Sequence, residues 1–393
     1  MKITHLITDM EIGGAQRLLC DLLPLGVKGY AETATVEGER DSKSDKQADQ
    51  MRLCILQGKG ASAFMDQLKD KEGIDIICLN PEDKHDLNTM FKSLRQLRKI
   101  IRDSHIVHVH LFPALYYAAI ASAGLKCKLI YTEHNTFNRR RLKKYLRPLE
   151  RWIYSRYSNV ICISKAVRNN LAHWIGKDKN SPYFRIINNG IPVNRFIEAT
   201  TAARRTDAEV QKKRSEIFGR QGIPVLMISR FVDSKDQPTL IRAIKEIEDT
   251  SIYAVLVGDG PRRGEYEELI KELKLEDRVI MLGSRSDISE LIAAAEIGVQ
   301  SSNWEGFGLT VVEMFAGMLP VIISEVDGLN SVADGYTLTF KRGDYKGLAR
   351  QIERMAGDSA LRRSIGTNGV NRARDFDIEI MGEQYHRLYT EGK

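Results

Sequence analysis

Two glutamates in the segment SSNWEGFGLTVVEMFAGMLPVIIS, residues 301–324, lie where a strand is expected to lead into a helix. IGVQSS predicts a strand, NWEGFG a loop and LTVVEMFAGM a helix, so Glu305 lies in the loop and Glu313 in the helix. Carboxylates there would repel a phosphate, whereas sugar hydroxyls could donate hydrogen bonds to them. Backbone N–H groups at the helix start would meanwhile face a phosphate. These groups belong to Gly306, Phe307, Gly308 and Leu309.

Two cations follow an earlier predicted strand in SRFVDSKDQPTLIRAI, whose helix is opened by Pro238. Arg230 and Lys235 lie just after that strand, where a guanidinium and an ammonium can meet a diphosphate. An exposed pair of cations is by itself more often solvated surface. The neighbouring motifs favour the phosphate site.

Three more strand-to-helix turns are rich in glycine. Gly258 follows a buried run in VLVGDGPRRGEYEELI, and in VIMLGSRSDISELI the backbone of Gly283, Ser284 and Arg285 could contact a nucleobase edge. Asp287 is expected to be the helix N-cap there.

The third turn is LITDMEIGGAQRLL, where Gly13 and Gly14 allow a ligand to approach a helix N-terminus, with a simple tight turn as the alternative. The dinucleotide fingerprint G-x-G-x-x-G is absent, which removes the main support for hydride chemistry.

These turns require a framework of alternating strands and helices, and the whole chain shows that alternation. The predicted strands are 2–8, 32–38, 75–80, 106–111, 128–134, 159–164 and 184–190 in the first half, and 224–231, 253–260, 279–283, 297–302 and 320–326 in the second. Its 393 residues exceed what one hydrophobic core usually supports. We predict two doubly wound α/β domains facing across a cleft, with ligands at the carboxyl ends of the strands. The predicted ranges are 1–200 for the first domain, 201–375 for the second, and 376–393 for a helix that could pack back on the first domain.

The ordered combination of EGFGLTVVE, MFAGMLPVIIS, SRFVDSKDQPTLI, VGDGP, NNGIPVNRF and TDMEIGGAQRLL resembles the family 4 glycosyltransferases of the GT-B fold. The resemblance implies retaining transfer of a hexosyl-type sugar from a UDP- or GDP-linked donor, without a cofactor. It implies that the domain 1–200 binds the acceptor and that the domain 201–375 binds the nucleotide sugar. It also implies that Glu305 contacts the donor sugar, that Glu313 binds the ribose, and that Arg230 and Lys235 neutralise the diphosphate. It also places His134, in YTEHNTF, beside the reaction centre.

Other histidines and acids have simpler interpretations. His108 and His110 alternate along a predicted strand and are expected to be structural. The only D-x-D string, at 375–377, is interpreted as capping the start of the last helix and not as a metal site. Fixed cations would replace a metal, and we predict no metal site.

The basic segment RRRLKKYLRPLERWIYSRY, residues 139–157, suggests the acceptor. An interfacial basic helix with aromatic rings would bind an anionic membrane and reach a lipid-linked glycan, as in capsule or lipopolysaccharide O-antigen assembly. The alternative is a solvated helix packed by a stripe of Leu142, Leu146, Leu149 and Ile153. The tentative membrane or acceptor residues are Arg140, Lys143, Lys144, Arg147 and Trp152.

Composition limits the remaining classes. A net charge of +7 hints at an anionic partner, but no motif or aromatic platform supports nucleic-acid binding. Five scattered cysteines and the absence of a signal peptide predict a cytoplasmic protein. The basic segment predicts that it is peripheral on the inner face of the membrane. The apolar run 111–125 is too short to span a bilayer and predicts a buried helix. Two alternatives remain open: a nucleotide-sugar epimerase, and a non-catalytic nucleotide-sugar-binding partner of another transferase.

Overall fold

The structure is a computed structural model that describes residues 1–11, 13–28, 49–58, 63–69, 71–84, 86–136, 138–203 and 207–391. It forms two compact units, one made of Met1–Gly190 with Ile378–Lys393 and the other of Ile191–Asp377. The first unit therefore ends before the expected boundary at residue 200, and the last helix joins the first unit.

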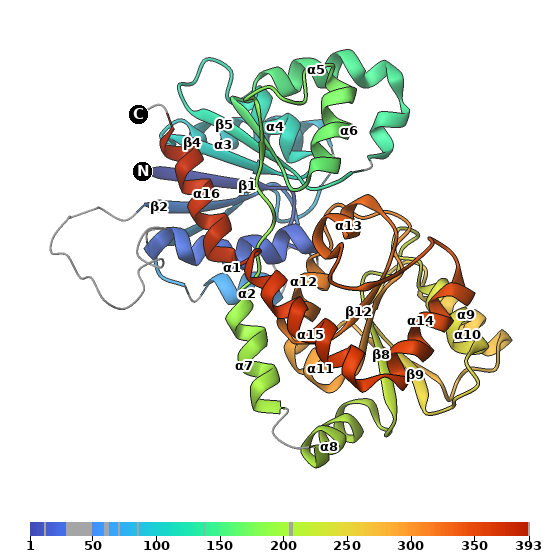
Figure 1. Cartoon of the computed structure of the whole chain (residues 1–393). Coiled ribbons are helices and arrows are strands. Elements are labelled where there is room, and N and C mark those ends of the chain that lie inside the picture. Colours follow the sequence, from blue (N-terminus) through green and yellow to red (C-terminus); the bar gives the residue numbers. More distant parts are fainter. Residues whose placement is uncertain are drawn as a thin grey trace, which may run out of the picture. The chain divides into compact units, whose positions relative to one another are not determined.

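The first unit is a parallel sheet with helices on its faces (Figure 1). Its described strands follow the order β3-β2-β1-β4-β5-β6-β7. The strands are β1 (Lys2–Ile7), β2 (Gln50–Ile55), β3 (Ile74–Cys78), β4 (Ile106–His110), β5 (Lys128–Glu133), β6 (Asn159–Cys162) and β7 (Phe184–Ile186). The helices are α1 (Gly14–Lys28), α2 (Ala63–Lys69), α3 (Leu87–Ile101), α4 (Ala114–Ala121), α5 (Arg147–Ser155), α6 (Lys165–Ile175) and α16 (Ile378–Thr390), with 3₁₀ turns at Arg139–Leu142 and Lys144–Leu146.

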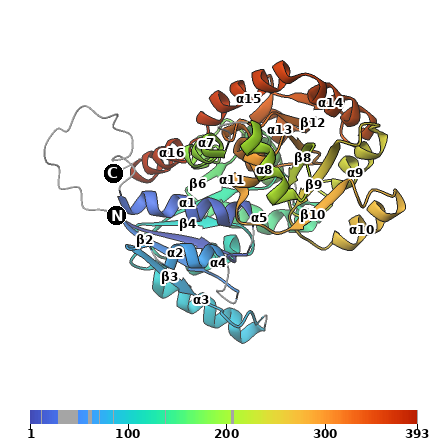
Figure 2. The ribbon, with the colours of Figure 1, turned by 90° about the horizontal axis from the view of Figure 1, so that it is seen from below.

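The C-terminal helix α16 completes the core of the first unit. It packs against α1, and the two lie side by side in both ribbon views (Figures 1 and 2). Tyr385 and Tyr389 of α16 are buried in one apolar cluster with Leu18 and Leu22 of α1 and Ile3 of β1. Residues from the two ends of the chain therefore share one core.

The second unit has a second parallel sheet, whose described strands follow the order β10-β9-β8-β11-β12-β13. The strands are β8 (Ile223–Ile228), β9 (Ile252–Val257), β10 (Val279–Gly283), β11 (Ile297–Gln300), β12 (Val321–Ser324) and β13 (Leu338–Phe340). The helices are α7 (Val193–Ala203), α8 (Asp207–Phe218), α9 (Gln237–Glu246), α10 (Arg263–Glu272), α11 (Ile288–Ala294), α12 (Leu309–Ala316), α13 (Asp327–Ala333), α14 (Tyr345–Gly357) and α15 (Ser359–Arg374).

The central strands of this unit are buried on both faces because helices cover both sides of a parallel sheet. Every residue of β9, IYAVLV, is buried, which explains the uninterrupted apolar run in its sequence. The strands form the interior, so the loops that follow them are left to carry the chemistry.

Every predicted strand that falls on described residues overlaps a strand of the structure, and the run 111–125 contains α4. The predicted strand 32–38 lies outside the described residues. Two strands were not predicted. β13 is only three residues long, and β2 begins with Gln50 and carries the charged Arg52. Tertiary structure accommodates that charge, since Arg52 Nε lies 2.9 Å from Asp75 Oδ2.

Candidate active site

The predicted cations and the first glutamate lie on the two loops at the topological switch point of the second unit. β8 pairs with β9 on one side and with β11 on the other. Ligands of doubly wound sheets bind outside the carboxyl ends of two such neighbouring strands. Arg230 and Lys235 follow β8, and Glu305 follows β11.

Lys235 and Glu305 form an ion pair between these two loops, and both side chains are largely buried. The loops are joined further by Ser301, whose hydroxyl donates to the carbonyl of Asp236 at 2.8 Å. Asn303 N–H donates to Ser234 O, also at 2.8 Å. Because both partners sit on braced backbone, the pair presents a positive and a negative group in fixed positions.

Arg230 is the available cation of this site. Its side chain is exposed, and no residue in the described part of the chain bonds its guanidinium. Its loop is held from behind, since Gln237 Nε2 donates to Arg230 O at 2.9 Å. Gly258 allows this packing: its φ is +135°, and a Cβ there would lie 2.0 Å from Ser229 O.

Helix α12 begins at the turn that holds Glu305. Gly308 at its N-cap has φ +98°, a conformation that favours glycine. Phe307 is buried, and its ring packs edge-on against Phe376. Phe307 therefore offers a ligand only its backbone. Glu313, one turn along α12 from Leu309, is partly exposed on the face next to the turn.

The turn after β10 differs from its predicted chemistry in one respect. Gly283 has φ +69°, and Ser284 and Arg285 follow it as expected. Asp287 occupies the N-cap position of α11, but its side chain caps no backbone N–H group. It instead accepts from Arg285 Nε at 2.8 Å, and this Arg285 hydrogen bond lowers the pKa of the Asp287 carboxyl. The capping prediction was wrong because a bidentate guanidinium is a stronger partner than a backbone amide.

In the first unit, His134 follows β5 and is partly exposed, and its Nε2 lies 3.3 Å from His110 Nδ1. Burial lowers the pKa of His134 to about 4, so the ring is neutral at neutral pH. Gly13 precedes α1, and Gly14 is the first residue of that helix. A Cβ on Gly13 would lie 2.4 Å from Gln16 Oε1, the end of a flexible side chain, so packing alone does not require glycine there.

The basic segment is not one helix. Two 3₁₀ turns precede α5, because Pro148 cannot lie in a helix interior and sits in the first turn of α5. The predicted leucine stripe is therefore broken. Ile153 is buried, but the exposed fractions are 69% for Leu142 and 45% for Leu149.

Several cations of this segment are engaged within the first unit. Arg140 Nε lies 2.9 Å from Oε1 of the buried Glu150, and its guanidinium stacks over Phe112. Arg147 donates to the carbonyls of His173 and Trp174, at the C-terminus of α6, where cations are favourable. These contacts hold the segment on the first unit. Arg140 and Arg147 therefore support the fold and are not free to bind a membrane or an acceptor.

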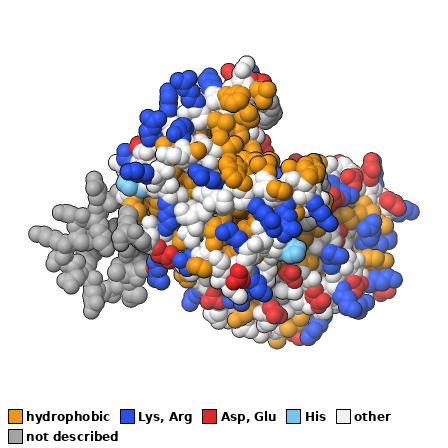
Figure 3. Space-filling view, turned by 90° about the horizontal axis from the view of Figure 1, so that it is seen from above, with side chains coloured by type: hydrophobic (Ala, Val, Ile, Leu, Met, Phe, Trp, Pro, Cys, Tyr) orange, Lys and Arg blue, Asp and Glu red, His pale blue; other side chains and the backbone are white. Residues whose placement is uncertain are grey.

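Lys143, Lys144 and Trp152 remain exposed, together with Leu142 and Tyr145. Figure 3 shows hydrophobic side chains beside groups of lysine and arginine on the face seen from above, which carries α5. Among the described residues, no helix is both long and apolar enough to cross a membrane.

Comparisons with known proteins agree with this geometry. Residues 208–372 match the family model of glycosyl transferases group 1, and residues 51–195 match that of glycosyltransferase family 4. The chain resembles family 4 glycosyltransferases. HepE of Anabaena, solved in complex with UDP-glucose, superposes with a TM-score of 0.81 at 21% identity over 99% of both chains. The predicted GT-B class, with two Rossmann-like parallel sheets, is confirmed.

Two curated glycosyltransferases illustrate the similarity. The lipopolysaccharide core biosynthesis glycosyltransferase LpsD of Rhizobium meliloti is 34% identical over 171 residues, which are 43% of this chain and 49% of LpsD. A UDP-Gal:alpha-D-GlcNAc-diphosphoundecaprenol alpha-1,3-galactosyltransferase of Escherichia coli is 24% identical, over 96% of this chain and 97% of its own. The chain spans about half the length of the curated relatives that it matches at 31 to 34% identity.

Sequence reasoning missed several residues that support this site. Gly328, in α13, allows the Glu305 loop to close, since a Cβ there would lie 2.2 Å from Glu305 O. The signal was present, because a glycine follows the predicted strand PVIISEV just as glycines follow the other strands. Gln237 and Ser301 carried no such signal, because their roles depend on which loops become neighbours.

Proposed function

We propose that this protein is a retaining glycosyltransferase that moves a hexosyl-type sugar from a nucleotide diphosphate sugar to a glycan or lipid-linked acceptor in cell-surface polysaccharide synthesis. The observation that carries the proposal is the combination of the Lys235–Glu305 pair and Arg230, whose guanidinium has no partner among the described residues, at the switch point. A diphosphate needs two cations, and a sugar hydroxyl needs an acceptor beside them.

In this proposal the sugar nucleotide replaces the internal ion pair. The diphosphate takes Lys235 and Arg230 as its partners, and Glu305 then accepts from the donor sugar. As the anomeric bond breaks, negative charge grows on the departing diphosphate, and each fixed cation there can lower the barrier by about 3 kcal/mol. These cations do the work that a metal ion performs in other transferases.

The remaining contacts follow from the turn positions. The start of α12 meets the diphosphate, and Glu313 accepts from the ribose hydroxyls. The backbone of Gly283–Arg285 meets the base, which is uracil or guanine. His134 hydrogen-bonds the donor sugar as a neutral ring.

A thermal-shift panel of UDP- and GDP-sugars tests donor binding, because a ligand that binds only the native state raises the melting temperature with its concentration. Arg230→Ala should lower turnover about 100-fold. The exposed Arg363 of α15 gives the matched control, Arg363→Ala, which should leave turnover unchanged. A chelator should have no effect. Full turnover in Arg230→Ala, or abolition by chelator, would contradict the leaving-group role.

Product analysis separates transfer from epimerisation. With a labelled sugar nucleotide, transfer places the label on a second molecule, whereas epimerisation releases an isomeric sugar or sugar nucleotide. Label that never leaves the nucleotide would refute the transferase proposal.

We also propose that the segment 142–152 places the enzyme on the anionic inner face of the cell membrane. Lys143 and Lys144 supply charge, and the exposed fractions of Tyr145 and Trp152 are 73% and 52%. Tyr and Trp rings favour the membrane interface because one end is polar.

Flotation with anionic liposomes at low salt tests the membrane proposal. Replacing Lys143 and Lys144 by Gln should lower the partition constant about thirtyfold, because each cation near the surface contributes about 1 kcal/mol. The same change at Lys245 and Lys271, exposed lysines of the second unit, is the control. Equal partition of both double variants would contradict the proposed surface.

A further inference from the structure

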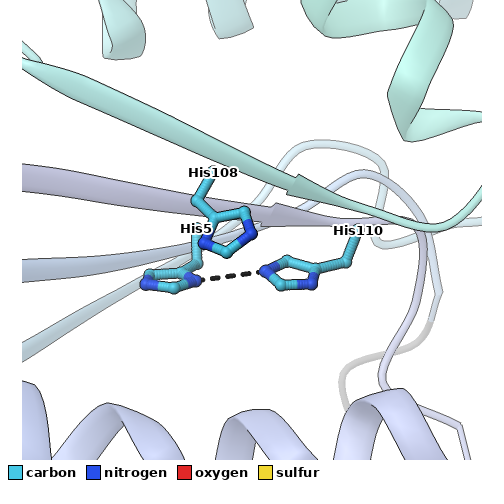
Figure 4. A group of neighbouring side chains, drawn as sticks. All are labelled: His5, His108 and His110. Carbon is cyan, nitrogen blue, oxygen red and sulfur yellow. Dashed lines mark hydrogen bonds between the residues drawn. The ribbon is translucent and has the colours of Figure 1, made fainter. Parts of the chain in front are cut away.

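Four histidines of the first unit meet across three neighbouring strands. His5 lies on β1, His108 and His110 lie on β4, and His134 follows β5. β4 pairs with both β1 and β5, which brings the rings together, and Figure 4 shows how His5, His108 and His110 lie. These three rings are fully buried, whereas His134 is partly exposed.

Three of the rings form a hydrogen-bonded chain from the core outward. His5 Nδ1 lies 3.2 Å from His110 Nε2, and His110 Nδ1 lies 3.3 Å from His134 Nε2. At the inner end, His5 Nε2 is buried and has no partner among the described residues. At the outer end, no described residue bonds His134 Nδ1, so this nitrogen is left for a ligand.

The two hydrogen bonds must run in the same direction. Burial keeps all three rings neutral, so each carries one N–H, and His110 can donate on one side only while it accepts on the other. If His134 donated to His110 and His110 donated to His5, the remaining proton of His5 would be on Nε2, which is buried and has no partner among the described residues. Proteins avoid an unpaired buried N–H more strictly than an unpaired acceptor. We therefore assign the protons to the three Nδ1 atoms, and His134 offers an N–H to its ligand.

His108 supports this chain from the side. Its Nε2 bonds Thr132 Oγ1 at 2.7 Å and its Nδ1 bonds Tyr389 of α16 at 2.5 Å. Its ring centroid lies 4.3 Å from that of His110. The same rings have the spacing of a metal site. However, both nitrogens of His108 and of His110 already have partners, and no carboxylate bonds any of these rings among the described residues to offset a divalent charge.

We infer that His110, held by His5, is a positioning residue for His134: it fixes the ring and holds its Nδ1–H toward the sugar hydroxyl that His134 contacts. This inference rests on the proposed function for the identity of the ligand, but the tautomer that it assigns can be measured without one. A neutral hydrogen-bond donor suits an uncharged sugar, because it adds direction without adding charge.

A matched pair of amide substitutions at His110 provides the test. Asparagine places its amide where Nδ1 faces His134, whereas glutamine places its amide where Nε2 faces His5. Histidine ¹⁵N NMR of the full chain should show His134 protonated at Nδ1 in the wild type and in His110→Asn. In His110→Gln the proton should be redistributed toward Nε2. His5→Leu breaks the inner bond instead and should cause a smaller change, which keeps the test usable if His110→Gln does not fold.

Kinetics give the second readout. His110→Gln should lower kcat/KM for the sugar nucleotide about tenfold, the equivalent of one hydrogen bond, and His110→Asn should recover most of that loss. Binding of the free nucleoside diphosphate should stay unchanged in both. If no nucleotide sugar binds the wild type, the proposed function fails while the NMR result still stands. An unchanged His134 tautomer in His110→Gln, or stoichiometric zinc in the purified protein, would overturn the inference.

Discussion

The histidine cluster predicts that acid weakens the first unit. Burial lowers the pKa of His5 to about 3 and that of His134 to about 4, from an ordinary value of 6.5. It also holds the pKa values of His108 and His110 well below the usual range. Because the folded state keeps these rings neutral, unfolding takes up protons below pH 6.5. The stability is fully present above that pH and falls as the pH drops toward the folded pKa values.

The magnitude follows from linkage. Between pH 7 and pH 5, a histidine that titrates at 6.5 when unfolded and near 3 or 4 when folded costs the protein about 2 kcal/mol. His5 and His134 together cost about 4 kcal/mol, and His108 and His110 act in the same direction. This is a large part of the 5–15 kcal/mol that usually separates folded from unfolded protein.

Urea denaturation at pH 7 and pH 5 measures this loss. In a Trp304→Phe background the remaining tryptophans, Trp152 and Trp174, both report on the first unit. His5→Gln should reduce the loss between the two pH values by about 2 kcal/mol, whatever its own effect on stability. His173→Gln, at an exposed position of α6, is the control and should leave the loss unchanged. Equal losses in the wild type and His5→Gln would refute the argument that His5 stays neutral in the fold.

Three further substitutions test the supports of the fold and the site. Gly258→Ala should destabilise the second unit by about 3 kcal/mol, because its φ is positive and the added Cβ meets a backbone carbonyl. Its control is Gly357→Ala, where the added Cβ lies in open space and should cost less than about 0.5 kcal/mol. Glu150→Gln should lower the free energy of unfolding by about 3 kcal/mol, since it leaves the largely buried guanidinium of Arg140 without its charged partner. A loss below about 1 kcal/mol would show that this ion pair is dispensable. Arg147→Ala should lower the free energy of unfolding by about 1 kcal/mol, because it removes the guanidinium that caps the C-terminus of α6. Arg156→Ala, at an exposed position, should have almost no effect. Denaturation midpoints of the two variants make the comparison.

The sequence alone determined the alternation of strands and helices and the turns that carry chemistry. Apolar runs identify strands because buried parallel strands are rich in apolar side chains, and β9 shows this over its full length. The same patterns placed Arg230, Lys235 and Glu305 at strand ends. Strand β2 was not predicted, because Arg52 interrupts its apolar pattern. The leucine spacing around Pro148 suggested one helical stripe, which the structure does not form.

Only the tertiary structure decided which side chains become partners. Lys235 and Glu305 lie 70 positions apart, and His5 and His110 lie 105 apart. They meet because of the order of strands in the two sheets, which no local pattern encodes. Tertiary structure likewise separated the engaged Arg140 and Arg147 from the available Arg230. A charge in a sequence becomes a binding group or a support only when packing decides what surrounds it.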